Sequence, residues 1–351
     1  MRKYGARFVL AVLSIGVVAF VAAGQNQKPV LDSFPWAYGF TKAGLDPAAP
    51  PCPPDAKPHD CSWPGRPWPD DGTLFHLRGT DRTFTVSQIQ SFWAPADWYP
   101  NEHPPAPDIV KYGHENLHLR ACGHCHYFNG QGKPENAGPA GLSYNYIMQQ
   151  LALFKSGGRK SADPRKANVN EMIQIARFLT DDEAKAAAHY YSSQKFHPWV
   201  KVVESTTAPK TRQSPAGAFI PLPGGETEPL GDRIVEVPQN PDRTEHLRDP
   251  HSGYVAYVPV GSIEKGKLLA TTGGSGKTIG CDNCHGENLT GGSFGEPPIA
   301  GRTTSYLVRQ LDGFNRFTRN GPGAQLMQPV VKNLSDQDIL DIAAYVASLA
   351  P

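Results

Sequence analysis

The 351-residue sequence has almost no charge imbalance, few sulfur-containing residues and no long apolar run beyond its N-terminal stretch. The formal net charge is +1, so no basic surface for nucleic acid or for an anionic membrane is indicated. Hydrophobic residues make up only 39% of the chain, while 35 glycines and 34 prolines indicate many loops. The composition therefore indicates a loop-rich protein without a nucleic-acid partner.

Residues 1–24 have the pattern of a secretory signal peptide. Arg2, Lys3 and Arg7 form a basic start, and the apolar run that follows, residues 8–23, ends in small residues. This run is shorter than the roughly 20 residues that a membrane-spanning helix prefers. The sequence therefore predicts export to the periplasm, and an uncleaved membrane anchor stays open as the alternative.

Four of the six cysteines lie in two short stretches that share the pattern C-x-x-C-H, ACGHCHYF and GCDNCHGE. This pattern is the attachment signature of c-type haem: two thiols form thioethers with the haem vinyl groups, and the next histidine binds the iron. His124 is not part of the pattern, because the second copy has Asn283 there. The predicted attachment residues are Cys122, Cys125, Cys281 and Cys284, and the predicted proximal iron ligands are His126 and His285.

One zinc site built from all four cysteines is the competing interpretation of these pairs. It is disfavoured because both pairs carry the additional histidine and because the chain has an export signal.

The two remaining cysteines, Cys52 and Cys61, stand in a short proline-rich loop. An exported protein can keep a disulfide, and such a loop is easily closed. The sequence therefore predicts a disulfide between Cys52 and Cys61.

The two C-x-x-C-H motifs belong to an internal repeat, in which the first motif matches the second at an offset of 159 residues. The segment that starts at Ala140 matches the one that starts at Ala300, and the segment at Met172 matches the one at Met327. Both copies show helical spacing of apolar residues, with helices expected at 143–156, 181–193 and 336–349. Capping boxes are expected at Thr180 with Glu183 and at Ser335 with Asp338. Identical matched residues include Tyr146 with Tyr306, Gln150 with Gln310, and Arg159 with Arg319.

Methionine is scarce, with four in the whole chain. Met172 and Met327 are matched by the repeat, whereas Met148 is matched with Val308 and is expected in the core. Each of the two matched methionines lies seven residues before a matched leucine, Leu179 or Leu334. A thioether opposite imidazole is a common ligand pair of c-type haem. Met172 and Met327 are therefore the expected distal ligands, and His114, His118 and His124 are the substitutes in the first copy.

On these motifs the chain resembles the dihaem class I cytochromes c over about residues 105–196 and 260–351. The resemblance implies a mainly α fold, two covalently bound haem c groups, His/Met ligation of each iron, and one-electron transfer between redox proteins without a small-molecule substrate. It also implies that a proline carbonyl before Ala-Gly orients each proximal histidine, which would be Pro298 in the second copy. The first copy has Pro139 one place later, which leaves its carbonyl open.

The expected organisation is a signal peptide at 1–24, a Pro/Trp-rich irregular extension at 25–104 that wraps a cytochrome unit, and cytochrome c domains at 105–198 and 261–351. A long, partly β-like connector at 199–260 lies between the domains, and the extension has one short helix within residues 85–93. The alternatives for function are a dihaem enzyme of the peroxidase or sulfur-compound dehydrogenase type, a fixed subunit of a membrane respiratory complex, and a structural docking protein.

Overall fold

The computed structural model describes residues 33–40, 70–214 and 216–351. The predicted signal peptide and the predicted disulfide pair, Cys52 and Cys61, lie outside the described residues, and both stay predictions. Among the helices of the described part, none is long and apolar enough to cross a membrane.

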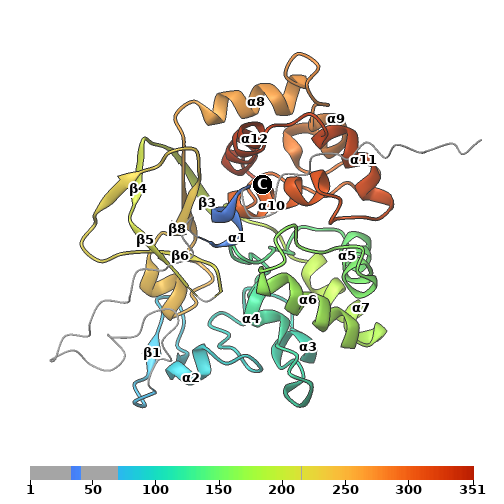
Figure 1. Ribbon diagram of the computed structural model, residues 1–351. Coiled ribbons are helices and arrows are strands. Elements are labelled where there is room, and N and C mark those ends of the chain that lie inside the picture. Colours follow the sequence, from blue (N-terminus) through green and yellow to red (C-terminus); the bar gives the residue numbers. More distant parts are fainter. Residues whose placement is uncertain (1–32, 41–69, 215) are drawn as a thin grey trace, which may run out of the picture.

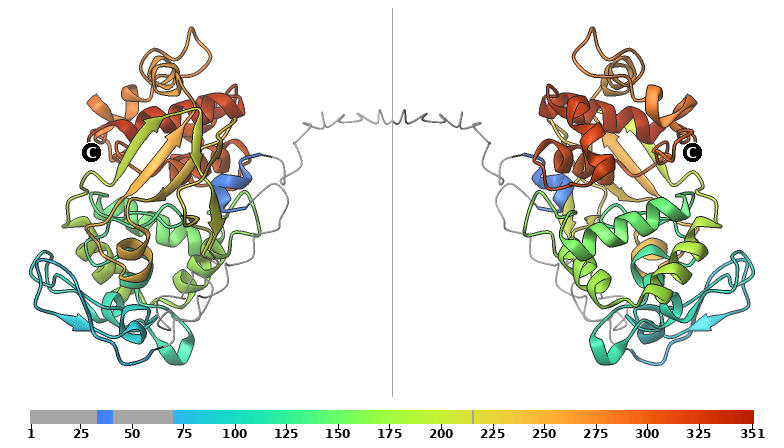
Figure 2. Two further views of the ribbon diagram at one scale, coloured as in Figure 1. Left: turned by 90° about the vertical axis from the view of Figure 1, so that its left-hand side faces the viewer. Right: turned by 90° about the vertical axis from the view of Figure 1, so that its right-hand side faces the viewer.

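Two helical units lie one above the other, with strands beside them (Figure 1), and the same arrangement is seen in the side views of Figure 2. The expectation of a mainly α fold is confirmed. The first unit consists of α3 (Asp108–Lys111), η2 (Glu115–Leu117), α4 (Cys122–His126), α5 (Tyr144–Ser156), α6 (Ala167–Phe178) and α7 (Asp181–Ser192). The second consists of α8 (Ser262–Thr272), α9 (Asp282–His285), η4 (Glu287–Leu289), α10 (Thr304–Asn315), α11 (Pro322–Val331) and α12 (Asp336–Ser348).

The last helix of each unit begins at the capping box that the sequence predicts. Thr180 accepts the backbone N–H of Glu183 at 3.3 Å, and the Glu183 carboxylate accepts the backbone N–H of Thr180 at 2.9 Å. Ser335 and Asp338 form the same reciprocal pair at the start of α12. Each box satisfies two backbone N–H groups that the first turn of a helix leaves without partners.

The connector between the units contains a three-stranded sheet, which confirms that it is partly β-structured as expected. β3 (Val200–Glu204) pairs in parallel with β9 (Tyr254–Val258), and β9 pairs in antiparallel fashion with β8 (Val235–Pro238). Three smaller antiparallel pairs complete the strands: β1 (Phe75–His76) with β2 (Thr83–Phe84), β4 (Thr207–Pro209) with β7 (Thr227–Pro229), and β5 (Thr211–Gln213) with β6 (Phe219–Pro221). A π-helical turn, η3 (Asp242–His246), lies between β8 and β9.

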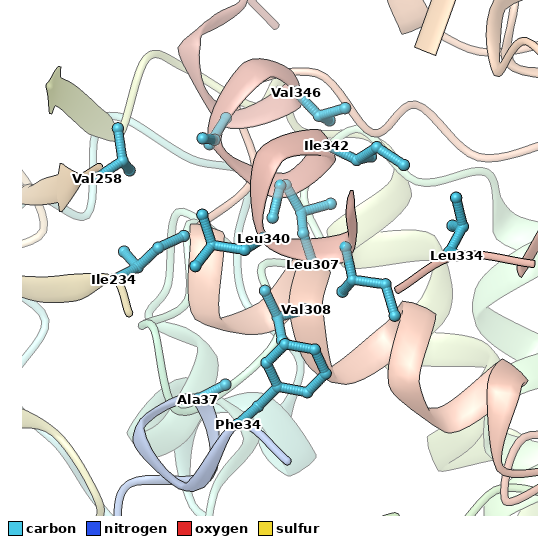
Figure 3. Packing of buried hydrophobic residues seen from close by; sticks show 14 of the residues in the cluster. Phe34, Ala37, Ile234, Val258, Leu307, Val308, Leu334, Leu340, Ile342 and Val346 are labelled. Atoms are coloured by element: carbon cyan, nitrogen blue, oxygen red, sulfur yellow. The ribbon is translucent and has the colours of Figure 1, made fainter. Parts of the chain in front are cut away.

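The described parts of the extension pack against both units. α1 (Pro35–Tyr38) contacts the second unit, where the Tyr38 hydroxyl donates to the Asp312 carboxylate at 2.6 Å. Figure 3 shows Phe34 and Ala37 beside the buried side chains of that unit. Residues 70–104 contact the first unit and η3. The described part of the extension therefore packs against a cytochrome unit, and the wrapping expected of the whole extension stays a prediction.

The short helix expected within residues 85–93 is present as α2, which spans Val86–Ile89. Beyond it the chain is held by tertiary contacts. The Gln90 side-chain amide donates to the carbonyls of Glu245 and His246, and the Ser91 carbonyl lies 3.0 Å from Nδ1 of His124.

The core of the second unit depends on a close crossing of α8 and α12. Gly266 of α8 is buried, and a Cβ at this position would overlap the Asp341 carbonyl oxygen and approach Cβ of Tyr345. The crossing therefore requires glycine at 266.

We expect Gly266→Ala to lower the free energy of unfolding by about 1–3 kcal/mol, because the added methyl forces the two helices apart. The matched control is Lys267→Ala, at an exposed position of the same helix. That change should alter the free energy of unfolding by less than about 0.5 kcal/mol. Urea unfolding of the holoprotein, followed by circular dichroism, measures both, and equal midpoints would contradict the close crossing.

Candidate functional site

Each helical unit encloses a cavity, and each cavity collects the four predicted residues of its own copy. The first cavity, about 180 Å³, is lined by Cys122, Cys125, His126 and Met172, among other residues. The second, about 310 Å³, is lined by Cys281, Cys284, His285 and Met327. In each unit, the motif and a methionine about 50 residues further along the chain therefore line the same cavity.

The two cysteine pairs line different cavities, so the chain does not assemble them into one site. Within the described ranges, no group of three or more His, Cys, Asp or Glu side chains is placed to hold a metal ion. The structure therefore does not support the four-cysteine zinc site.

A backbone carbonyl orients each motif histidine. Nδ1 of His126 lies 2.7 Å from the Ala137 carbonyl, and Nδ1 of His285 lies 2.8 Å from the Pro297 carbonyl. Because a carbonyl can only accept, Nδ1 carries the proton and Nε2 keeps a free lone pair. Burial lowers the pKa of both imidazoles, which favours the neutral form that binds metals.

The carbonyl expected from the family pattern in the second copy was assigned to the wrong residue, because the partner of His285 is Pro297, not Pro298. The first copy's carbonyl, which the sequence left open, belongs to Ala137, two residues before Pro139. Ala137 and Pro297 are equivalent in the repeat. A backbone carbonyl is available at any residue type, so the proline of the second copy is not required in the first.

Three of the four motif thiols, Cys122, Cys125 and Cys281, lie in buried surroundings that keep them protonated. Burial raises the pKa of Cys122 to about 12 and the pKa of Cys125 and of Cys281 to about 11. A dithiol redox pair works through a thiolate of lowered pKa. These environments therefore disfavour a thioredoxin-like role for the C-x-x-C pairs.

Met172 in α6 and Met327 in α11 occupy equivalent places, each partly buried against the core of its own unit. The substitute ligands lie elsewhere. Nε2 of His114 contacts the Glu183 carboxylate, His118 ends η2 in the left-handed conformation, and His124 is buried against the extension. None of the three lines either cavity.

The two cavities share a polar wall at the junction of the units, which we call the shared wall. The residues that line both cavities include Tyr146, Gln150, Arg159, Tyr306, Gln310 and Arg319. Arg159 donates to the side-chain oxygens of Gln150 at 2.8 Å and of Gln310 at 2.9 Å. Arg319 donates to the same two oxygens, each at 3.1 Å, and to the Tyr146 hydroxyl at 3.2 Å.

Sequence reasoning did not assign a function to the shared wall. The signal was present, because the repeat matches Tyr146 with Tyr306, Gln150 with Gln310, and Arg159 with Arg319. Identical polar residues at equivalent positions of two copies are expected to meet when the copies pack face to face.

Four buried arginines at these cavities have no carboxylate among their hydrogen-bond partners in the described chain: Arg159, Arg302, Arg309 and Arg319. Burial lowers the pKa of Arg159, and it lowers that of Arg302 to about 10. A buried cation is costly unless an anion accompanies it. A haem carries carboxylate side chains and a large apolar ring, so its charge and its size both fit these cavities.

The sequence model of the cytochrome c family matches this chain twice, at residues 110–195 and 263–350. These ranges fall inside the predicted units at 105–198 and 261–351, whose limits stay predictions.

Curated relatives support the same class. The thiosulfate dehydrogenase electron acceptor of Stutzerimonas stutzeri (strain A1501) is 33% identical over 244 residues, which cover 69% of this chain and 84% of the relative. The protein of the same description from Thiomonas intermedia (strain K12) is 25% identical over 230 residues, or 65% of this chain and 78% of the relative. Cytochrome c4 of Azotobacter vinelandii is 32% identical over 84 residues, which cover 22% of this chain and 40% of the relative.

Solved structures with partial likeness include a thiosulfate dehydrogenase from Marichromatium purpuratum, with a TM-score of 0.44, 24% identity, and coverage of 68% of this chain and 38% of that chain. Cytochrome c4 from Pseudomonas stutzeri gives a TM-score of 0.42 and 22% identity, over 65% of this chain and 93% of that chain.

A fold of two helical units with a repeated Cys-Cys-His motif defines a dihaem protein of class I type. The chain belongs to the cytochrome c family, and it holds two covalently bound haem c groups.

We expect Arg319→Lys to destabilise the shared wall by about 1–2 kcal/mol, because an ammonium group cannot donate to Gln150, Gln310 and Tyr146 in the fixed geometry of a guanidinium. Arg177→Lys, at an exposed position of α6, is the matched control and should change stability little. Urea unfolding of the two holoprotein variants measures the difference. Equal free energies of unfolding would show that the geometry of Arg319 does not matter.

Proposed function

We propose that the protein is a periplasmic carrier of single electrons, placed between a dehydrogenase or a quinol-oxidising complex and an oxidase or another cytochrome. The observation that carries the proposal is the convergence of two cysteines, one histidine and one methionine in each of two cavities. Haem c, when bound, supplies a one-electron couple at each site.

In this proposal the residues have separate roles. Cys122 and Cys125 hold one haem, and Cys281 and Cys284 hold the other. His126 with Met172, and His285 with Met327, would bind the two irons. Two protein ligands at each iron would leave no position there for a substrate, which favours a carrier over a dihaem peroxidase.

The surrounding chain keeps these ligands in place. The Ala137 and Pro297 carbonyls hold the protons of the two histidines on Nδ1, so that Nε2 is directed to the metal. The arginines of the shared wall provide positive charge where the haem carboxylates can lie. Apolar residues of α5 and α10 exclude water from the cavities, which are lined in part by Leu151 and Leu307.

The relatives suggest one electron donor more specifically. Two of them are described as electron acceptors of thiosulfate dehydrogenase. We propose that a thiosulfate-oxidising enzyme is a donor to this protein, which would then accept electrons from that reaction and not perform it. A sulfur-compound dehydrogenase activity of the chain itself is the second candidate, because one structure with partial likeness is a thiosulfate dehydrogenase.

Three measurements on the purified holoprotein test the proposal. The intact mass should exceed the processed polypeptide by two haems, and acid extraction should release neither. Thiosulfate alone should leave the protein oxidised, whereas thiosulfate with a catalytic amount of a thiosulfate dehydrogenase should reduce both haems. Reduction by thiosulfate alone, or prompt binding of cyanide or carbon monoxide at one haem, would favour the enzyme instead.

Replacing Met327 by His tests the ligand assignment. Imidazole is a stronger donor than a thioether and favours ferric iron, so the potential of the second haem should fall clearly, within the range of about 0.8 V over which axial ligands act. The first haem should shift much less. Met148→Leu is the control and should leave both potentials nearly unchanged. Wild-type potentials for both haems in a redox titration of Met327→His would exclude Met327, and with it the assignment of Met172 by symmetry.

A further inference from the structure

The second cysteine of the motif is more exposed at the second cavity than at the first. Cys284 is exposed, whereas Cys125 is only partly exposed. Equivalent helices of the repeat bound both cavities, so the difference in exposure comes from segments outside the repeat that cover one motif.

The extension and the connector close the cysteine edge of the first unit. The backbone N–H of Ala121 donates to the Phe92 carbonyl at 2.9 Å, and the Phe92 ring meets the His124 ring edge-to-face at 4.8 Å. From the connector, the Arg248 guanidinium donates to the His124 carbonyl. Two segments distant in sequence therefore cover the first motif.

At two equivalent positions beside the cavities, the first copy has charged residues and the second copy has apolar ones. In the first unit, Nε of Arg120 lies 2.7 Å from Oε1 of Glu171, and its guanidinium lies 4.0 Å from the Phe92 ring centroid. The repeat places Ile279 at the position of Arg120 and Leu326 at the position of Glu171. Ile279 is 43% exposed and Leu326 is 70% exposed. An ion pair thus lies beside the first cavity, where the second has two exposed apolar side chains.

A third exposed apolar residue extends this surface. Phe294 is 96% exposed, and it lines the second cavity together with Ile279, Leu326 and Cys284. We call Ile279, Phe294 and Leu326 the apolar rim. Exposed apolar residues grouped around a functional opening are typical of a binding surface, whereas single ones need no explanation.

Charges near the apolar rim indicate the sign of the partner. The segments 277–298 and 322–332 contain three carboxylates, Asp282, Glu287 and Glu296. Of their two lysines, Lys277 is paired with Asp338 at 2.6 Å, which leaves Lys332. The excess of carboxylates favours a partner whose own contact surface is basic.

We propose that redox protein partners dock on the second unit, with the apolar rim at the centre and these carboxylates around it, and that the first unit has no docking site at its own cysteine edge. The partner is a redox protein whose cofactor edge is apolar and ringed by lysines. This inference rests on the proposed electron-carrier function. The two cavities are neighbours across the shared wall. Electrons could therefore reach the first haem through the second, without a docking site on the first unit.

Carbodiimide cross-linking locates the docking surface without measuring activity. The probe is mitochondrial cytochrome c, which carries lysines around its haem edge, and the holoprotein is used at low ionic strength. Cross-links to Glu287, Asp282 or Glu296 are expected, and they should disappear at high salt. Asp182, with a side chain that is 95% exposed on the first unit, is the internal control. Cross-links that form mainly on the first unit would overturn the proposal.

Electron exchange with the same probe tests the apolar rim. Phe294→Lys should slow oxidation of the reduced protein by mitochondrial cytochrome c about tenfold, because it adds a like charge at the centre of the contact. The matched control is Phe178→Lys on the first unit, at a phenylalanine that is 55% exposed, and it should change the rate less than about twofold. Phe294 is too exposed to support the fold, so loss of structure is not expected.

A small cationic oxidant, tris(phenanthroline)cobalt(III), distinguishes a wrong docking surface from a wrong electron-carrier function. If both variants and the wild type react normally with the cobalt complex and Phe294→Lys is also normal with cytochrome c, the docking surface is wrong. If Phe178→Lys slows the protein reaction as much as Phe294→Lys, the first unit is a docking site and the proposal is overturned. If the wild type exchanges electrons reversibly with neither oxidant, the electron-carrier function itself fails.

Discussion

The hydrogen bond from Nδ1 of each motif histidine to a backbone carbonyl is the interaction on which both sites depend. It fixes the tautomer, and it leaves Nε2 as the ring nitrogen that can bind a metal. The carbonyl must therefore return to the histidine across a short loop. In both copies a glycine N–H closes that loop on the histidine carbonyl, from Gly132 to His126 at 3.1 Å and from Gly291 to His285 at 2.8 Å. Gly132 has a φ of +70°, and a Cβ there would overlap the Ala137 carbonyl itself.

The residues that gather in each cavity could be predicted from the sequence because their pattern is short and repeated. The C-x-x-C-H spacing and the alignment of Met172 with Met327 depend on residue types that few other sites use. The identity of the orienting carbonyl could not be predicted in this way, since every residue has a carbonyl and only the loop path selects one. The sequence also predicted a short helix within residues 85–93, but spacing cannot show its exact bounds, Val86–Ile89, or the contacts of Gln90 and Ser91 with segments distant in sequence.

The duplication preserves the interior of the units and changes their edges. Residues that meet across the shared wall are identical in both copies, because each must pack against its own counterpart. At the rim the copies differ, since Arg120 and Glu171 form an ion pair where Ile279 and Leu326 are exposed. Within residues 33–40 and 70–104, the described part of the extension covers the first motif and not the second, so two equivalent sites have different access to the surface. This asymmetry is not visible in the repeat alone, because it depends on where the extension and connector fold back.

The buried arginines bring positive charge to the two cavities without a hydrogen-bonded carboxylate in the described part of the chain. Arg159, Arg302, Arg309 and Arg319 are each only 4–8% exposed, and their hydrogen bonds go to neutral oxygens. Hydrogen bonds to amide and carbonyl oxygens offset part of the cost of burying a guanidinium, but they do not neutralise its charge. The chain also has a low hydrophobic content of 39%, so side chains alone provide a modest apolar core. A haem would add an apolar ring that can pack on the apolar lining of each cavity and carboxylates that can pair with the arginines. Folding of the units and attachment of the haems should therefore be coupled, with the arginines of the shared wall ordered fully only when both cavities are filled.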